Sequence, residues 1–245
     1  MNSDRHRTRW IKRPSTREDE TIISSPTGWK SDTMRLAIIA CDILKGEIES
    51  LTKDDPDFTH REYLEFALHE NPENMRDVIV EKVNSLRGQV DAVLLGYAVC
   101  SSLENVTERF DVPAVMLPGA DCIDALLGPE EYAREKKVCA GTWFSSPGWA
   151  MEGLNGLIKE LHLDSMEGYD PSFFFDIIFA SYERVLFIDT GIGDADEYRR
   201  LSGEFADGLK LRLDCRCCNL DRIADTVRRA KELGASLSSS NGNNA

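Results

Sequence analysis

The chain has 245 residues, of which 42% are hydrophobic and 29% charged, enough to bury the core of a domain of ordinary size. Modest glycine and plentiful apolar residues exclude collagen, a coiled coil and wholesale disorder. Acidic residues outnumber basic ones by 43 to 29, and the net charge of −14 argues against nucleic acid or an anionic membrane surface as a partner.

The two ends of the sequence differ from its middle. Residues 1–33 are basic, polar and without periodicity, which predicts a disordered leader, and Met34 is an alternative start because a strand follows at once. Residues 236–245 predict a disordered tail. No run approaches the roughly 20 apolar residues of a membrane span, and no apolar segment follows the basic N-terminus as in a secretory signal. We therefore expect a cytoplasmic protein.

The first third of the body begins with a buried strand. Residues 35–40 form a continuous apolar run, typical of a strand covered on both faces. Helical patterns are expected over residues 43–53, 60–70 and 72–87, with the Asn-Pro pair at 71–72 starting the last of them.

The same alternation continues to the end of the body. Strands are expected at 90–96, 113–117, 183–188 and 210–213, and helices at 123–137, 194–207 and 219–233. Strands that alternate with helices indicate an α/β fold of one domain over residues 34–235, with a mostly parallel, doubly wound sheet and helices on both faces. Residues 139–182 lack clean periodicity, and we expect an irregular aromatic insertion there.

Three of the seven cysteines follow predicted strands. Cys41, Cys100 and Cys122 fall at or just beyond the carboxyl ends of three strands, where parallel sheets bind ligands, so they are expected to converge in one cleft. Converging thiolates favour zinc or another thiophilic metal. The alternative is that each cysteine is a small buried hydrophobe.

A third interpretation assigns reactivity to one thiol. Cys122 lies just before a predicted helix, where a lowered pKa would make it a nucleophile. His69 or Asp121 would then be its catalytic helper, although His69 at a helix end is more often bonded to local carbonyls. Asp121 could equally orient the neighbouring cysteine without taking part in the reaction.

A second cysteine group is crowded into one segment. Cys215, Cys217 and Cys218 are expected in the loop between the last strand and the last helix. Such crowding fits a metal or redox role, but no matching C-x-x-C pair exists elsewhere, and incidental thiols in a loop are the simpler account.

Two further segments are candidates for binding a cofactor or small-molecule ligand. Thr190, Gly191 and Gly193 form a glycine-bearing turn between a strand and a helix, which can hold an anion on backbone N–H groups. Trp143 and Trp149 lie in a turn-rich aromatic segment that either lines a pocket for a flat ligand or pins a loop onto the core.

Several stretches together resemble a family of bacterial and archaeal proteins, the domain of unknown function 1638. They are ACDILKGE (40–47), LHENPE (68–73), LLGYAVC (94–100), VMLPGADCIDALLG (115–128), GTWFSSPGW (141–149) and VLFIDTGIGD (185–194). The resemblance implies that the positions of Cys41, Cys100 and Cys122 usually hold cysteine. It also implies a histidine where this chain has Ala120, and glycines where it has Ser101 and Ser102.

The resemblance further implies a role in methyl-group or corrinoid metabolism, because relatives often occur near corrinoid-dependent methyltransferase systems. A methyltransferase or a corrinoid protein would then be the partner. The chain lacks the D-x-H-x-x-G pattern, so we do not expect a corrinoid bound through the usual histidine. Three hypotheses result: a metal-binding protein, a metal-free thiol enzyme with Cys122 as nucleophile, and a non-enzymatic accessory that delivers or senses a cofactor.

Overall fold

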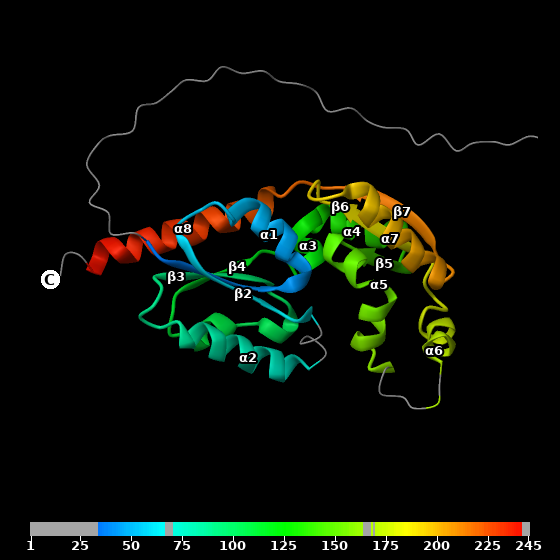
Figure 1. Cartoon of the computed structure of the whole chain (residues 1–245), viewed down its shortest axis with the longest axis horizontal. Coiled ribbons are helices and arrows are strands. Elements are labelled where there is room, and N and C mark those ends of the chain that lie inside the picture. Colours follow the sequence, from blue (N-terminus) through cyan, green and yellow to red (C-terminus); the bar gives the residue numbers. More distant parts are fainter. Residues whose placement is uncertain (1–33, 67–70, 164–167, 169, 242–245) are drawn as a thin grey trace, which may run out of the picture. The chain divides into compact units, whose positions relative to one another are not determined.

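The computed structural model describes residues 34–66, 71–163, 168 and 170–241, which belong to one compact unit (Figure 1). His69 and the leader lie outside the described residues. None of the described helices is both long and apolar enough to cross a membrane.

The first sheet has four parallel strands in the order β2-β1-β3-β4. They are β1 (Leu36–Cys41), β2 (Phe58–Leu64), β3 (Ala92–Ala98) and β4 (Ala114–Leu117). The central strands β1 and β3 are almost wholly apolar because both of their faces are covered. Ile38 pairs with Leu94 in this register, and both side chains are fully buried.

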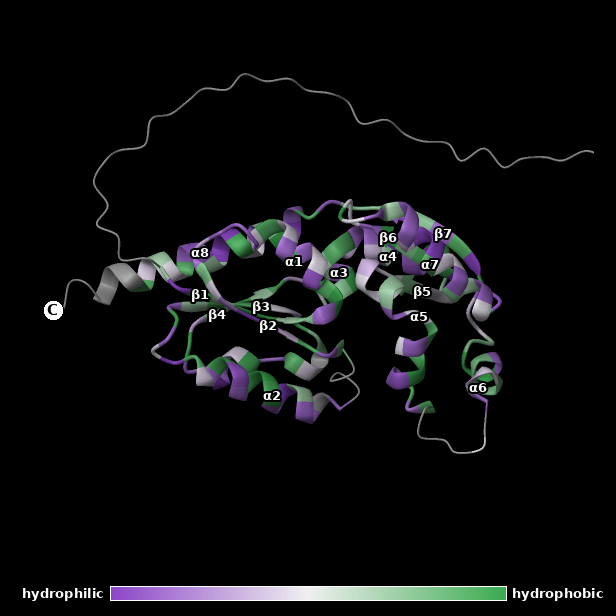
Figure 2. Cartoon of the chain, viewed as in Figure 1, coloured by the Kyte–Doolittle hydropathy of each residue, from purple (hydrophilic) through white to green (hydrophobic). Residues whose placement is uncertain are grey.

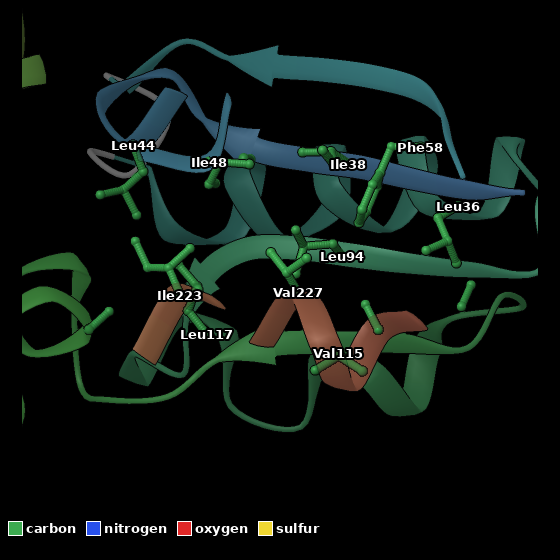
Figure 3. Packing of buried hydrophobic residues seen from close by; sticks show 14 of the residues in the cluster. Leu36, Ile38, Leu44, Ile48, Phe58, Leu94, Val115, Leu117, Ile223 and Val227 are labelled. Atoms are coloured by element: carbon green, nitrogen blue, oxygen red, sulfur yellow. The ribbon is translucent and has the colours of Figure 1, made fainter. Parts of the chain in front are cut away.

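Helices cover both faces of the first sheet. On one side lie α1 (Lys45–Thr52), α3 (Cys122–Leu127) and α8 (Asp221–Asn241), and on the other lies α2 (Pro72–Ser85). Figure 3 shows Ile223 and Val227 of α8 directed at Leu94 and Leu117 of the sheet. In Figure 2, α2 carries both hydrophilic and hydrophobic residues, as expected for a helix with one buried face.

Short 3₁₀ turns connect several of these elements. They are η1 (Asp42–Leu44), η3 (Ser101–Leu103) and η4 (Val106–Arg109). The turns η1 and η3 follow the carboxyl ends of β1 and β3, so they border the edge where the cysteines lie.

The second sheet has three parallel strands in the order β5-β6-β7. Its strands are β5 (Thr142–Ser145), β6 (Arg184–Asp189) and β7 (Arg212–Cys217), and its helices are α4 (Pro129–Val138), α5 (Pro147–Glu160), α6 (Pro171–Ile178) and α7 (Ala195–Gly208). Val185 of β6 packs against α5, α6 and α7. Arg184, one residue earlier and therefore on the opposite face, pairs with the fully buried Glu135 of α4 at 2.8 Å.

The expected α/β class, the parallel strands and the helices on both faces are confirmed. The strands form two sheets where we expected one, because strand partners are chosen by tertiary packing that a linear pattern does not contain. The helix expected over 60–70 is wrong, since residues 58–64 form β2. This is an edge strand with polar residues between Phe58 and Leu64, so it lacks the apolar run that marks a central strand.

Three other expectations need correction. Residues 139–182 contain β5, α5 and α6 in place of an irregular insertion. The helix expected over 123–137 is divided into α3 and α4 at Gly128, whose φ of 82° is incompatible with a helix. The last strand extends to Cys217, and α8 continues to Asn241, into the segment predicted to be a disordered tail.

Candidate functional site

A pocket of about 300 Å³ opens at the carboxyl ends of β1 and β3, and three cysteines line it. Cys41 is the last residue of β1, Cys100 follows β3, and Cys122 is the first residue of α3. The three cysteines therefore line one pocket, because parallel strands bring the chain segments that follow them to the same edge of the sheet.

The rest of the pocket wall is mostly apolar. Ile43 and Leu44 of η1, Met75 of α2, and Phe66 supply most of it, together with Trp149 of α5. The rings of Phe66 and Trp149 meet edge to face at 5.3 Å between centroids. These apolar walls lower the effective dielectric constant around the thiols.

A glycine brings α5 onto the pocket wall. A Cβ atom at Gly148 would lie 2.1 Å from the carbonyl oxygen of Ile43, so only glycine fits this contact. The N-terminus of α5, which belongs to the second sheet, therefore rests directly on η1 of the first sheet. This contact fixes Trp149 in the pocket.

Burial keeps two of the three thiols protonated at neutral pH. Desolvation is the main cause that raises the pKa of Cys122 to about 12, and the charge of Asp121 adds to it. Desolvation also raises the pKa of Cys41 well above its usual range. The pKa of Cys122 rises although it begins a helix, because burial outweighs the favourable helix N-terminus.

Asp121 also lines the pocket, and its carboxylate is already bonded on both oxygens. It caps α3 by accepting a hydrogen bond from the N–H of Asp124 at 2.8 Å, and it accepts a second hydrogen bond from the hydroxyl of Tyr132 at 2.6 Å. The cap explains why the helix begins at Cys122. The role expected for Asp121 as catalytic helper of Cys122 stays a prediction, and His69, the alternative helper, lies outside the described residues.

The sequence analysis did not select Tyr97, although this residue lies near the carboxyl end of β3 and lines the pocket. Its hydroxyl oxygen is buried and has no hydrogen-bond partner among the described residues. Burial raises the pKa of this phenol, and the neighbouring Cys41 and Asp42 raise it further. The signal was available, because Tyr97 follows a buried strand at the same edge as the cysteines.

The three cysteines share a pocket but do not form a ready metal centre. Within the described ranges, no three His, Cys, Asp or Glu side chains are arranged so that they could hold a metal ion. In this arrangement the sulfur atoms line the pocket as separate thiols.

The glycine-bearing turn lies outside this pocket. Thr190 is buried and donates a hydrogen bond to Oε1 of Glu47 at 3.2 Å, and the N–H of Gly191 donates to the carboxylate of Asp189 at 2.9 Å. Gly191 and Gly193 have φ values of 73° and 59°, which form the turn into α7. The anion-binding role expected for Thr190, Gly191 and Gly193 stays a prediction.

The two tryptophans have different surroundings. Trp149 lines the cysteine pocket, whereas Trp143 of β5 packs against Phe179 and Phe205 in the core of the second sheet. The ring centroids of the two tryptophans are 5.5 Å apart, so Trp143 packs edge to face against Trp149.

The second cysteine group lies largely on a strand. Cys215 and Cys217 belong to β7 and are exposed, which corrects the expected loop, and only Cys218 follows the strand. Cys218 is partly buried, and its N–H donates to the carbonyl of Asp189 at 2.9 Å. Desolvation raises the pKa of its thiol to about 12, with the charge of Glu47 as the next cause.

The chain matches the model of a known protein family. The family described as protein of unknown function (DUF1638) matches residues 63–227, more than half of the chain, and the chain belongs to this family. No curated protein and no solved structure matches the chain. The family resemblance is therefore confirmed, and the link to corrinoid-dependent methyltransferase systems stays a prediction.

Proposed function

We propose that this DUF1638 protein binds a small, mostly apolar molecule in the pocket lined by Cys41, Cys100 and Cys122. The observation that carries the proposal is the pocket itself, where three thiols from separate elements meet apolar walls in about 300 Å³. This volume equals about ten water molecules and lies at the lower end of the range for ligand pockets.

The residues that line the pocket indicate what kind of ligand it favours. Met75, Phe66 and Trp149 favour an apolar body, and the edge of an aromatic ring fits between such groups. Protonated thiols are weak hydrogen-bond donors, so they favour a ligand with a soft atom or a weak acceptor at that end. A carboxylate or phosphate ligand is disfavoured, because the largest charge effect on Cys122 comes from the carboxylate of Asp121, which also lines the pocket.

The test uses neutral molecules of about ten non-hydrogen atoms, such as indole, followed by ligand-observed NMR. Cys100→Phe places a ring in the pocket, and Cys217→Phe makes the same substitution at an exposed cysteine of β7. We expect indole to bind the wild type and Cys217→Phe but not Cys100→Phe. Equal binding by all three proteins, or binding by none, refutes the proposal.

A thiophilic metal ion, with zinc first, is the second candidate, and the convergence of three cysteines favours it. The thiols would have to turn toward one another and release their protons, so metal affinity would rise with pH. Titration with Co²⁺ monitors thiolate ligation through its absorption bands. One tightly bound equivalent, lost in the triple Cys→Ala variant but kept in Cys139→Ala, would establish the metal in place of the organic ligand. Cys139 is buried outside the pocket.

The resemblance also supports a place for this pocket in methyl-group or corrinoid metabolism. A corrinoid ring is far larger than the pocket, so only a small fragment or a methyl-bearing molecule would enter it. Co-purification with a methyltransferase or a corrinoid protein tests the partner. A chain that forms no such complex at micromolar concentration argues against the partnership.

A further inference from the structure

Glu47 is a fully buried carboxyl group that the pocket does not use. It lies in the first turn of α1, just beyond the pocket residues Ile43 and Leu44, and its exposed fraction is 0%. Oε1 accepts the hydrogen bond from Thr190 at 3.2 Å. Oε2 is buried without a hydrogen-bond partner in the described part of the chain. A buried polar oxygen without a hydrogen-bond partner lowers the stability of the fold, so its presence needs an explanation.

The Glu47–Thr190 hydrogen bond connects the two sheets. Glu47 follows β1 of the first sheet, and Thr190 follows β6 of the second. The same segments touch again at Gly46, where a Cβ atom would lie 2.8 Å from Cδ1 of Ile192. The first turn of α1 therefore packs on residues 190–193.

The groups that interact electrostatically with Glu47 include two thiols. The charge of Glu47 raises the pKa values of Cys122 on α3 and of Cys218 after β7. Asp121 also raises the pKa of Cys122, and Asp189 also raises that of Cys218. Cys217 also acts on Cys218. On its own element, Lys45 lies over the ring of Tyr63, 5.4 Å from the ring centre.

Among the residues that the structure describes, no cation offsets the effect of burial on the pKa of Glu47. Burial raises this pKa from 4.5 to about 7, although the backbone N–H of Glu47 and the hydroxyl of Thr190 partly oppose the shift. An ionised carboxylate here would be desolvated with only those donors to stabilise it, which is unfavourable.

We propose that Glu47 is a pH-sensitive switch between the two sheets: the protonated carboxyl group holds α1 against residues 190–193, and loss of the proton favours local separation of these segments. Separation admits water, which solvates the carboxylate and restores an ordinary acidity. The switch does not depend on a ligand in the pocket.

The direction of the pH effect follows from the two protonation states. The closed form binds a proton more tightly than the open form, so opening becomes more favourable as the pH rises from about 4.5 to about 7 and then levels off. Between pH 5 and pH 8 the opening equilibrium should rise by more than tenfold.

Hydrogen–deuterium exchange of the full chain tests the switch. Peptides covering α1 and residues 190–193 are compared at pH 5 and pH 8, after correction for the intrinsic pH dependence of exchange. We expect wild-type protection in both peptides to fall by more than tenfold, and Glu47→Gln to show equal protection at both pH values. Glu49→Gln, on the same helix, should behave as the wild type does.

Thr190→Val gives a second, directional readout. The substitution removes a hydrogen bond that lowers the pKa of Glu47 in the closed form, so the fall in protection should continue to a higher pH and be larger in total than in the wild type. Unchanged wild-type protection, or the same pH dependence in Glu47→Gln, overturns the proposal. If Glu47→Gln does not fold, the pKa values of the glutamates are measured in the ¹³C-labelled wild type by NMR titration. An ordinary pKa for every glutamate would also overturn the proposal.

Discussion

The burial of Glu47 predicts a pH-dependent difference in global stability between the wild type and Glu47→Gln. The folded pKa of about 7 lies about 2.5 units above the ordinary value of 4.5. Each unit corresponds to about 1.4 kcal/mol, so the ionised group lowers the free energy of unfolding by roughly 3 kcal/mol at pH 8. This amount is a large fraction of the roughly 5–15 kcal/mol that stabilise an ordinary domain.

The sign follows from proton linkage. The folded pKa is raised, so the favourable contribution is complete below pH 4.5 and is lost as the pH rises through 7. The glutamine variant cannot titrate, but it places an amide N–H₂ near the position of the unpartnered Oε2. This buried donor costs about 1–3 kcal/mol, and the cost is the same at every pH.

Urea denaturation at pH 5 and pH 8 measures the effect. The free energy of unfolding of Glu47→Gln, minus that of the wild type, should increase by about 2–3 kcal/mol between the two pH values. Subtraction cancels the other titrating groups, and Glu49→Gln serves as the control. A difference that stays constant within about 0.5 kcal/mol, or that changes in the opposite direction, refutes the reasoning.

Three further predictions concern packing, charge and reactivity. Gly148→Ala should lower stability by about 1–3 kcal/mol or more in thermal denaturation, because its Cβ would collide with the carbonyl of Ile43; an unchanged melting temperature contradicts the contact. Glu135→Leu should cost about 3–5 kcal/mol in urea denaturation, since it leaves Arg184 buried without its main partner, and Arg184→Leu in the same chain should recover part of the loss. Iodoacetamide should label Cys122 more than tenfold more slowly than a free thiol at pH 8, as followed by mass spectrometry, and fast labelling would contradict its raised pKa.

Much of the fold could be predicted from apolar runs. The strands β1, β3 and β6 are buried on both faces, so their sequences are continuous apolar segments that stand out from their surroundings. The edge strands β2 and β5 are partly polar or short, and they resemble helix or irregular chain when they are considered alone. The division into two sheets depends on which strands pair, and local patterns do not specify this.

The candidate site was predictable where one rule applied. Cys41, Cys100 and Cys122 each follow a strand, and the carboxyl edge of a parallel sheet brings such residues together. The same rule would have selected Tyr97. It could not separate convergence in a pocket from ligation of a metal, because that distinction depends on the side-chain positions.

Glu47 could not be found from the sequence. A glutamate beside Ile48 in an amphipathic helix is usually exposed, and nothing in the segment KGEIESLT distinguishes Glu47 from Glu49. Only the packing of α1 on the segment around Thr190, which follows a strand of the other sheet, buries the first of these glutamates.

The electrostatics of this edge bear on what the thiols can do. The largest charge effects on Cys122 and Cys218 come from Asp121, Glu47 and Asp189, and each of them raises a thiol pKa. A nucleophilic cysteine needs the opposite setting, with a cation or a base that favours the thiolate. Neutral thiols against apolar walls are suited to contact a ligand without attacking it. Protonation of Glu47 removes one of these negative charges and makes both thiols more acidic, so the carboxyl group that connects the two sheets also tunes the chemistry of the cysteines beside it.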